Sequence, residues 1–464
     1  MTDSTSAQRL WAPRAWVQGQ WRESVLLEID AAGNWSAVQP ATPRPDGVAA
    51  LPGPVLPGLV NAHSHAFQRA FAGLAERRET GSDDFWSWRD RMYRVALGIT
   101  PKQLEAVATQ LYAELLRGGY TQVCEFHYLQ HAIDGSRHAD ALAMSRALMR
   151  AATSAGIGLT MLPVLYERAG FTQPTLRDDQ RRFATTADEV IVLRDGVRKA
   201  AAPRVNAGVA IHSLRAASPA SITRLVERCS GDDGPIHIHV AEQTGEVDDC
   251  IAATGARPIE WLARHVALDS RWQLVHATHA TTQEIEAVAR SGAGVVICPS
   301  TEANLGDGLC DLPRWLGART MLSIGSDSHV TRAWREELRW LEYGQRLRLR
   351  QRNVASAPEL GLPASAQRLF NRCLAGGASA AGFSAWGLQP GARADLLVID
   401  SDDSSLLGIP DDRLLDALVF SSPGRPWRDV MVAGRWVVRG HRHAAAQAIA
   451  SNFTDAMAAL ASTL

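Results

Sequence analysis

The middle of the chain alternates short apolar runs with longer amphipathic stretches, and this rhythm is the strongest constraint on its fold. The runs are rich in β-branched residues, as buried strands are, and most are separated by stretches with helical periodicity. The strand-like runs are 54–61, 121–127, 157–165, 205–212, 235–241, 272–277, 293–299 and 320–326, and the helical stretches are 101–117, 138–155, 178–200, 218–229, 257–266 and 281–290. Eight strands in this order predict an α/β fold, a TIM-type (β/α)8 barrel.

Both ends of the chain differ from the middle. Residues 9–56 are rich in Trp, Val and Gly with short alternating stretches, and the runs 394–399 and 430–439 are also strand-like. Two strand-rich flanks predict one small β-sandwich domain built from both termini. The predicted divisions are 1–56 with 385–441 for the β domain, 57–384 for the barrel, and 442–464 for a closing Ala-rich helix.

Composition narrows the function classes. The 464 residues carry a net charge of −1 and are 46% hydrophobic, so neither nucleic acid nor a membrane surface is an expected partner. The N-terminus lacks the basic-then-apolar pattern of a signal peptide, which predicts a cytoplasmic location. The six Cys include no Cys-x-x-Cys pair, and we expect isolated buried thiols.

Polar residues gather where the strand-like runs end. His63 and His65 stand two residues apart, and side chains alternate faces along a strand, so both imidazoles point the same way and form half of a transition-metal site. Functional groups of such barrels lie at the carboxyl ends of the strands. The later runs end in His127 and Tyr128, Tyr166, His212 and Arg215, His237 and His239 with Glu242, His276, Glu302, and Asp327 with His329.

Each of these residues has a structural alternative when it is taken singly. His276 alone could be a hydrogen-bonded core histidine, and Asp327 alone could be a helix N-cap. Glu302 and His329 could be solvated loop residues. Jointly, four His and one Asp at the ends of the first, fifth, sixth and eighth strands would be a rare accident, because ionisable groups are costly in a core.

The chain resembles the amidohydrolase superfamily over nearly its whole length. The motifs that carry the resemblance are 57–65, 237–242, His276, 325–327 and 387–399. The resemblance implies one divalent metal held by His63, His65, His239 and Asp327. His237 faces the same way as His239, and we prefer His239 because the general acid of the family, here Glu242, follows the ligand by three residues.

The metal is predicted to be a single ion. Three imidazoles and one carboxylate with an open position suit Zn²⁺, with Fe²⁺ and Mn²⁺ as alternatives. Binuclear members of the superfamily bridge two ions through a carboxylated Lys after strand four, whereas Lys102 and Lys199 are the only Lys here and neither follows a strand. In the implied mechanism Asp327 and His276 share the handling of a metal-activated water, and Glu242 delivers a proton to the leaving nitrogen.

Longer motifs point to a substrate class. Segments 63–76, 84–93, 125–128 and 212–216 resemble the N-formimino-L-glutamate deiminases of this superfamily, which implies hydrolysis of N-formimino-L-glutamate to N-formyl-L-glutamate and ammonia in histidine degradation. Arg forks suit the two carboxylates of this small dicarboxylate. The candidate substrate residues are Gln68, Arg89, Tyr128, His212 and Arg215. We also predict a homodimer.

Alternatives remain open at this point. Arg89 could belong to a surface-packing loop or a dimer contact, and the segment 66–100 reads as a long loop, either a lid or a subunit contact. A purine, pyrimidine or triazine deaminase or chlorohydrolase on the same scaffold would call for aromatic stacking residues rather than two Arg. A catalytically inactive barrel that serves as a binding module would not need the intact ligand set.

Overall fold

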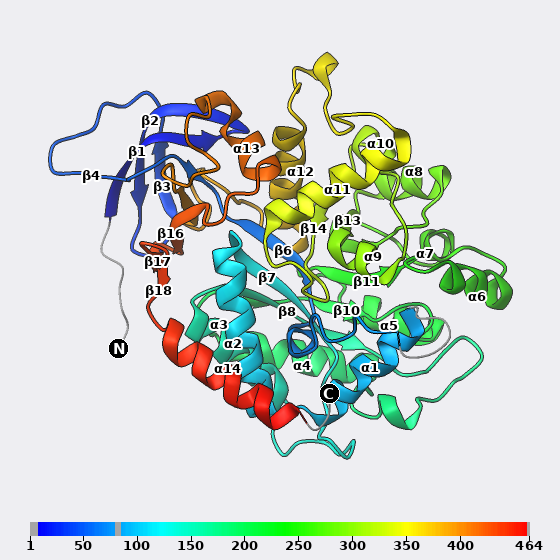
Figure 1. The fold of residues 1–464 in the computed structure, drawn as a ribbon. Coiled ribbons are helices and arrows are strands. Elements are labelled where there is room, and N and C mark those ends of the chain that lie inside the picture. The colour runs from blue at the N-terminus through cyan, green and yellow to red at the C-terminus, as the bar shows by residue number, and fades with distance from the viewer. Residues whose placement is uncertain (1–7, 79–84, 462–464) are drawn as a thin grey trace.

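A computed structural model describes residues 8–78 and 85–461 of the chain. Within these residues, parallel strands pair in the order β6, β7, β8, β10, β11, β12, β13 and β14, with β9 beside β8 (Figure 1). Helices surround the strands, and the predicted (β/α)8 barrel is confirmed. The barrel strands are β6 (Leu59–Ser64), β7 (Tyr120–His127), β8 (Gly158–Leu165), β9 (Val205–Ala207), β10 (Val209–Ile211), β11 (Ile236–Val240), β12 (Trp272–His276), β13 (Gly294–Ile297) and β14 (Met321–Ile324).

Several helices start at capping residues. Thr100, Thr186 and Thr281 each accept a hydrogen bond from the backbone N–H three residues further on, which satisfies a donor that a first helical turn leaves unpaired. The helices are α1 (Phe85–Gly98), α2 (Pro101–Arg117), α3 (Ala143–Ala155), α4 (Ala187–Lys199), α5 (Pro219–Arg228), α6 (Thr244–Thr254), α7 (Pro258–His265), α8 (Thr282–Ser291), α9 (Pro299–Leu305), α10 (Leu312–Gly317), α11 (Trp334–Leu349), α12 (Ser365–Ala380), α13 (Leu414–Phe420) and α14 (Ala446–Leu460), with short 3-10 turns at η1 (Ala66–Ala70), η2 (Asp178–Gln180), η3 (Pro358–Leu360) and η4 (Asp411–Arg413).

The two ends of the chain form a second sheet beside the barrel, as predicted (Figure 1). In it, β5 pairs with β1 on one side and with β15 on the other, so this strand joins the two terminal segments. Leu27 and Trp35 from one end pack with Leu396 and Met431 from the other in one buried cluster. The strands are β1 (Gln8–Val17), β2 (Gln20–Ile29), β3 (Trp35–Gln39), β4 (Ala49–Ala50), β5 (Val55–Leu56), β15 (Leu396–Ile399), β16 (Trp427–Val432), β17 (Arg435–Arg439) and β18 (Arg442–His443).

Two predicted strands are each divided in the structure. The run 54–61 contributes β5 to the terminal sheet and β6 to the barrel, with Pro57 and Gly58 between them. The run 205–212 is interrupted at Gly208, where a Cβ atom would lie 2.2 Å from the carbonyl oxygen of Pro235. The two halves of the first run belong to different sheets, whereas β9 and β10 both pair with β8 and only β10 also pairs with β11. An apolar run alone reveals neither division, so the sequence prediction merged the halves.

The segment 66–100 is not the long loop that the sequence predicted. It contains η1 and the 14-residue helix α1, while residues 79–84 lie outside the described ranges. The predicted helix 178–200 also differs, since η2 and α4 are separate elements, and the predicted helix 138–155 begins at Ala143. These differences matter for function, because they place Arg89 on a helix rather than on a loop.

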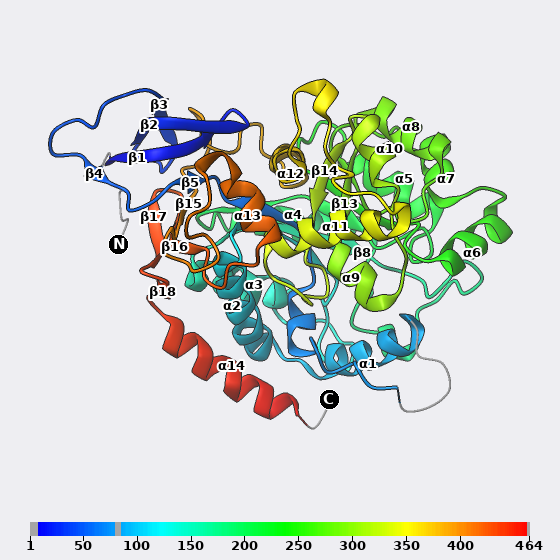
Figure 2. The same ribbon diagram turned by 45° about the horizontal axis from the view of Figure 1, so that its top comes forward.

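The closing helix is confirmed as α14, which lies along α2 on the outside of the barrel (Figure 2). Residues 462–464 of the predicted helix lie outside the described ranges. None of the helices in the described part of the chain combines the length and the apolar character that a bilayer span needs. The exact domain divisions at 56, 384 and 441 stay a prediction.

The barrel closes where its last strand meets its first. The backbone N–H of Asp327, just after β14, donates to the carbonyl oxygen of His63 at 3.0 Å, and the N–H of His65 donates to the carbonyl oxygen of Asp327 at 3.4 Å. The Asn61 amide adds a second link, since its Oδ1 accepts from the Ser326 N–H at 2.8 Å and its Nδ2 donates to the Ser326 hydroxyl at 2.7 Å. This closure joins two segments that both carry predicted metal ligands.

Helix α12 covers the closure through a pair of glycines. A Cβ atom on Gly376 would lie 2.1 Å from the carbonyl oxygen of Leu322 in β14, and one on Gly377 would lie 2.9 Å from Cβ of Val60 in β6. Neither approach leaves room for a side chain, because real Cβ atoms essentially never come within 3.0 Å of another heavy atom of this kind. The helix can therefore lie directly on the seam only with glycine at these positions.

We expect Gly376→Ala to destabilise the protein by about 1–3 kcal/mol, because the added methyl group forces α12 away from β14. Thermal melting followed by circular dichroism measures the effect. Gly317→Ala in α10 is the matched control, since no atom lies within 4 Å of its added methyl group. Equal melting temperatures for the two variants would contradict the close packing described here.

Candidate active site and metal centre

A pocket opens at the carboxyl ends of the barrel strands and encloses about 620 Å³ of space, counting its mouth. The residues that sequence analysis selected for substrate binding all line it, and so do five from the metal and catalytic sets. The first group is Gln68, Arg89, Tyr128, His212 and Arg215, and the second is His65, His239, Glu242, His276 and Asp327, with His63 in contact with His65.

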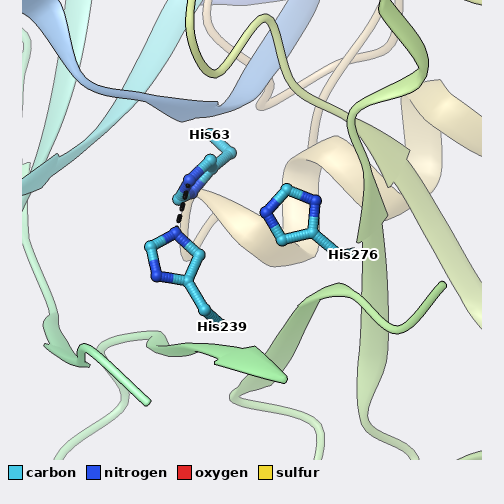
Figure 3. A group of neighbouring side chains, drawn as sticks. All are labelled: His63, His239 and His276. Carbon is cyan, nitrogen blue, oxygen red and sulfur yellow. Dashed lines mark hydrogen bonds between the residues drawn. The ribbon is translucent and has the colours of Figure 1, made fainter. Parts of the chain in front are cut away.

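Three histidines turn their Nε2 atoms toward one point. Nε2 of His63 lies 3.1 Å from that of His65. It lies 2.9 Å from Nε2 of His239, and this contact is drawn as the dashed line in Figure 3. The Nδ1 atoms of the two partners are tied to backbone, His65 to the Phe126 carbonyl at 3.0 Å and His239 to the His212 carbonyl at 3.0 Å. Because a carbonyl only accepts, Nδ1 carries the proton in both rings, and both Nε2 atoms present lone pairs.

Asp327 faces the same point. Its Oδ1 lies 3.5 Å from Nε2 of His63 and 3.4 Å from Nε2 of His65. Burial opposes ionisation of this carboxyl, but His63, His65 and His276 hold its pKa well below the usual range, so it is a carboxylate. The site therefore joins one anion to a group of imidazole nitrogens.

This donor set fits a divalent metal ion. Burial lowers the pKa of His63 to about 3 and also lowers the pKa values of His65 and His239, so all three rings are neutral and able to coordinate. Lone pairs that face each other at these distances repel unless a cation lies between them. Donor atoms around one tetrahedral zinc lie about 3.3 Å apart, given bonds of about 2.0–2.1 Å. The observed spacing of the donor atoms agrees with that value.

Glu125 holds the turn that carries the His63 and His65 pair. Its side chain, on β7, accepts hydrogen bonds from the Ser64 hydroxyl at 2.8 Å and the Ala66 N–H at 2.6 Å. His329, which could have been a solvated loop residue, is instead fully buried, and its Nε2 lies 3.1 Å from the carbonyl oxygen of His65. Both contacts fix the orientation of the loop and neither places a further ligand at the cluster.

His237 and His239 contact different partners in the structure. Nε2 of His237 lies 2.8 Å from the carbonyl oxygen of Ala380 on α12, away from the cluster, whereas His239 contacts His63. Side chains two residues apart on a strand point the same way, but they lie at different depths in the barrel. Depth decides which of the two imidazoles can reach the other donors.

His276 lies beside the histidine cluster and among carboxylates (Figure 3). Its Nε2 is 3.4 Å from Oε1 of Glu242, and its Nδ1 is 3.3 Å from Oε1 of Glu302. Burial lowers the pKa of His276, but Glu242, Glu302 and Asp327 outweigh burial and raise it. Glu302 is thus a buried partner of the imidazole rather than a solvated loop residue. Burial raises the pKa of Glu242, although the nearby His276 opposes the rise.

The backbone at the site adopts the left-handed conformation at several non-glycine residues. The φ angle is +51° at Ala241, +69° at His276 and +46° at Asp327. L-residues avoid this region, and such strain is kept where the surroundings force it, frequently at functional sites. The strained residues lie at or next to Glu242, His276 and Asp327, which are the proposed proton-handling groups.

Two guanidinium groups face the pocket from different elements. Arg89 lies on α1 with its guanidinium 4.5 Å from the ring of Trp86 and 5.5 Å from that of Tyr93, and Arg215, after β10, lies 5.6 Å from the same Trp86. Burial lowers the pKa of Arg89, as do the positive charges of Arg215 and Arg177, although Tyr93 opposes the change. Cations that crowd together inside a pocket favour an anionic ligand.

Helix α1 owes its place to a residue that sequence analysis did not select. Arg182 is fully buried and donates to backbone carbonyls at the end of α1, to Ala96 and, at 2.9 Å, to Ile99. A cation suits the negative end of a helix dipole. An Arg in a polar stretch gives no sequence signal of such a long-range contact, so this anchor could not be predicted.

Neutral donors complete the pocket wall. Nε2 of Gln68 donates to the hydroxyl of Tyr128 at 3.2 Å, and Nδ1 of His212 lies 3.2 Å from the Ser213 hydroxyl. The lining also includes Tyr93, Tyr166 and Glu246, which belong to neither the predicted substrate-binding set nor the predicted catalytic set. Glu246 follows Glu242 by one helical turn, and this spacing was the available signal; its carboxylate accepts from the Glu242 N–H at 3.1 Å.

Comparisons with known proteins agree with this geometry. The model of the amidohydrolase family matches residues 55–437, which is most of the chain. The chain belongs to the amidohydrolase family. The barrel fold that the sequence predicted is that of this family, and the superfamily is metal-dependent.

Three relatives of this amidohydrolase are informative. Formimidoylglutamate deiminase of Pseudomonas aeruginosa is 47% identical over 452 residues, which cover 97% of this chain and 99% of that protein. A crystal structure of an amidohydrolase from Brucella melitensis superposes with a TM-score of 0.92 at 40% identity, covering 98% of this chain and 100% of that one. An adenosine deaminase from Xanthomonas campestris with bound zinc shares the fold, with a TM-score of 0.81, 22% identity and 98% coverage of both chains.

We expect His239→Gln to lose the bound metal of this amidohydrolase, because it removes an imidazole from the donor cluster. His237→Gln is the matched control, since it changes the same residue type on the same strand and its amide can still donate to the Ala380 carbonyl. Metal content after gel filtration, measured by elemental analysis, checks both. Retention of a full equivalent by His239→Gln would move the metal away from this cluster.

Proposed function

We propose that this amidohydrolase hydrolyses N-formimino-L-glutamate to N-formyl-L-glutamate and ammonia, a step of histidine degradation, with one zinc ion at His63, His65, His239 and Asp327. The observation that carries the proposal is the 47% identity to a formimidoylglutamate deiminase over 97% of this chain and 99% of that protein. The cytoplasmic location and the homodimer stay predictions.

The pocket supports a dicarboxylate substrate. Arg89 and Arg215 offer two fork-shaped donors, which suit carboxylates. Gln68, Tyr128 and His212 add donors beside them. The pocket also contains aromatic rings, which a nucleobase deaminase would use for stacking, but Tyr93 and Trp86 lie against the guanidinium groups. This arrangement of rings against cations favours the dicarboxylate over a flat heterocycle.

The residues of the site divide the proton handling. A divalent metal held by His63, His65, His239 and Asp327 would act as a Lewis acid toward the formimino group and would increase the acidity of a water molecule. The ionised carboxylate of Asp327 accepts a proton from the attacking water. His276, protonated at Nε2, stabilises the negative charge that develops as the water oxygen bonds to the formimino carbon.

Glu242 completes the reaction as the proton donor, whereas Asp327 accepts protons from the water. Burial raises the pKa of its carboxyl, so it holds a proton more readily than an exposed Glu. It delivers this proton to the formimino nitrogen and takes up in its place the proton that Asp327 accepted. Glu242 then delivers this second proton to the same nitrogen, the carbon–nitrogen bond breaks, and ammonia departs. The proton of the new hydroxyl passes to Asp327 as the carbonyl forms and from there to Glu242, so the site returns to its starting state with one water consumed.

The direct test is ammonia release from purified, zinc-loaded protein. We expect turnover of N-formimino-L-glutamate, and none above background with adenosine, 8-oxoguanine or a chlorotriazine, because only the first offers two carboxylates to Arg89 and Arg215. A coupled assay for ammonia measures all four. Absence of turnover with N-formimino-L-glutamate would refute the proposed function, and turnover of a heterocycle would favour the nucleobase or triazine alternative.

Substitution of one pocket cation tests the substrate pose. We expect Arg215→Ala to raise KM for N-formimino-L-glutamate by about 10- to 100-fold, which corresponds to the loss of a charge-assisted hydrogen bond of about 1.5–3 kcal/mol. Metal content should stay unchanged, since Arg215 does not belong to the donor cluster. Arg224→Ala, at an exposed Arg on α5 paired with Asp188, is the control. Loss of metal from Arg215→Ala would show that its role is misassigned.

A further inference from the structure

The two oxygens of Asp327 face different groups of donors. Oδ1 lies 3.5 Å from Nε2 of His63 and 3.4 Å from Nε2 of His65, whereas Oδ2 lies 3.8 Å from Nε2 of His276. A carboxylate that turns one oxygen to each side has the geometry with which proteins bridge two cations. Oδ2 of Asp327 and Nε2 of His276 could therefore bind a second cation together.

Cys298 completes a second donor group on that side. Its Sγ, a nitrogen of His276 and an oxygen of Asp327 all lie within 4.8 Å of one another, and all three residues are buried. Cys298 follows β13 and packs with Ala62, Val296 and Ala380 below the pocket. The proposed reaction does not use this thiol.

Glu302 orients both of the partners of Asp327. Its Oε1 accepts from the Cys298 N–H at 2.9 Å and lies 3.3 Å from Nδ1 of His276. The contact at Nδ1 directs Nε2 of His276 toward Asp327 and Glu242, as carboxylates do for metal-binding histidines. Three carboxylates around one imidazole also give the group a negative potential that attracts a cation.

We propose that His276, Cys298 and Asp327 form a second, inhibitory metal site that takes a soft divalent cation, Cd²⁺ or excess Zn²⁺, bridged through Asp327 to the first. The inference rests on the proposed function, in that it takes His63, His65, His239 and Asp327 as the resident metal set. When the cation binds, the S–H bond of Cys298 and the N–H bond at Nε2 of His276 break, and both protons leave to solvent. Sγ and Nε2 each form a bond to the metal, with no change of oxidation state.

A cation bound at this second site stops turnover, because it occupies groups that the reaction needs. The cation takes Nε2 of His276 and Oδ2 of Asp327, and the same two groups handle charge and protons in the proposed reaction. The thiol sets the selectivity, since thiolates prefer cadmium and zinc, whereas Mg²⁺ prefers oxygen ligands. The site is thus distinct from the resident one, which has no sulfur donor.

The experiment titrates Cd²⁺ into protein that already contains one zinc per chain. We expect one further cadmium per chain, retention of the zinc, the ultraviolet charge-transfer band of a cadmium–thiolate bond, and loss of ammonia release at the same midpoint. Mg²⁺ should produce none of these changes. If zinc-loaded protein releases no ammonia at all, the proposed function fails, while the absorbance and the metal count still decide the second site.

Cys298→Ser is the decisive variant, with Cys298→Ala in reserve should the serine protein not fold. We expect the band to disappear and the cadmium midpoint for inhibition, relative to the cadmium-free rate of the same variant, to rise by at least about tenfold, which is the loss seen even for partners one shell further from a metal. Cys373→Ser, at another buried thiol, should keep the parental band. A band that persists in Cys298→Ser, or cadmium that only replaces the zinc, would overturn the proposal.

Discussion

The closure of the barrel between β14 and β6 is the interaction on which the site depends. The Asp327 N–H and the His63 carbonyl form a hydrogen bond across the seam, and Asn61 ties Ser326 to the same place. The residues that close the cylinder therefore also bring the carboxylate to the imidazoles. A barrel left open at this seam would keep its strands but would have no metal centre, so fold and chemistry share one set of contacts.

Burial lowers the pKa of every histidine in the site, but carboxylates reverse its effect on one of them, and this contrast gives the site its chemistry. Burial keeps His63, His65 and His239 neutral, as metal ligands must be. A few ångströms away, carboxylates keep His276 charged. The difference arises from partners rather than from depth, because every one of these rings is buried. One cavity thus contains both neutral histidines and a protonated histidine.

Sequence alone predicted the elements that depend on local pattern. Strand periodicity located the barrel, and the His63 and His65 spacing indicated the cluster. Sequence analysis failed where the position of a residue depends on a partner far away in the chain. The division of 54–61 between two sheets, the buried pairing of Glu302 with His276, and the anchoring of α1 by Arg182 all join segments far apart in the chain. No local periodicity encodes such pairings, so a polar residue can be predicted to be exposed when it is a buried partner.

The position of β5 between β1 and β15 has a consequence for how the protein is made. Residues 8–56 emerge from the ribosome well before β15, which starts at Leu396. Their sheet lacks its central junction until that strand has been synthesised. The first barrel strand likewise waits for β14. For most of translation, the nascent chain carries unpaired strand edges, which invite association with other chains. Chaperone protection is therefore needed most before the last segment arrives.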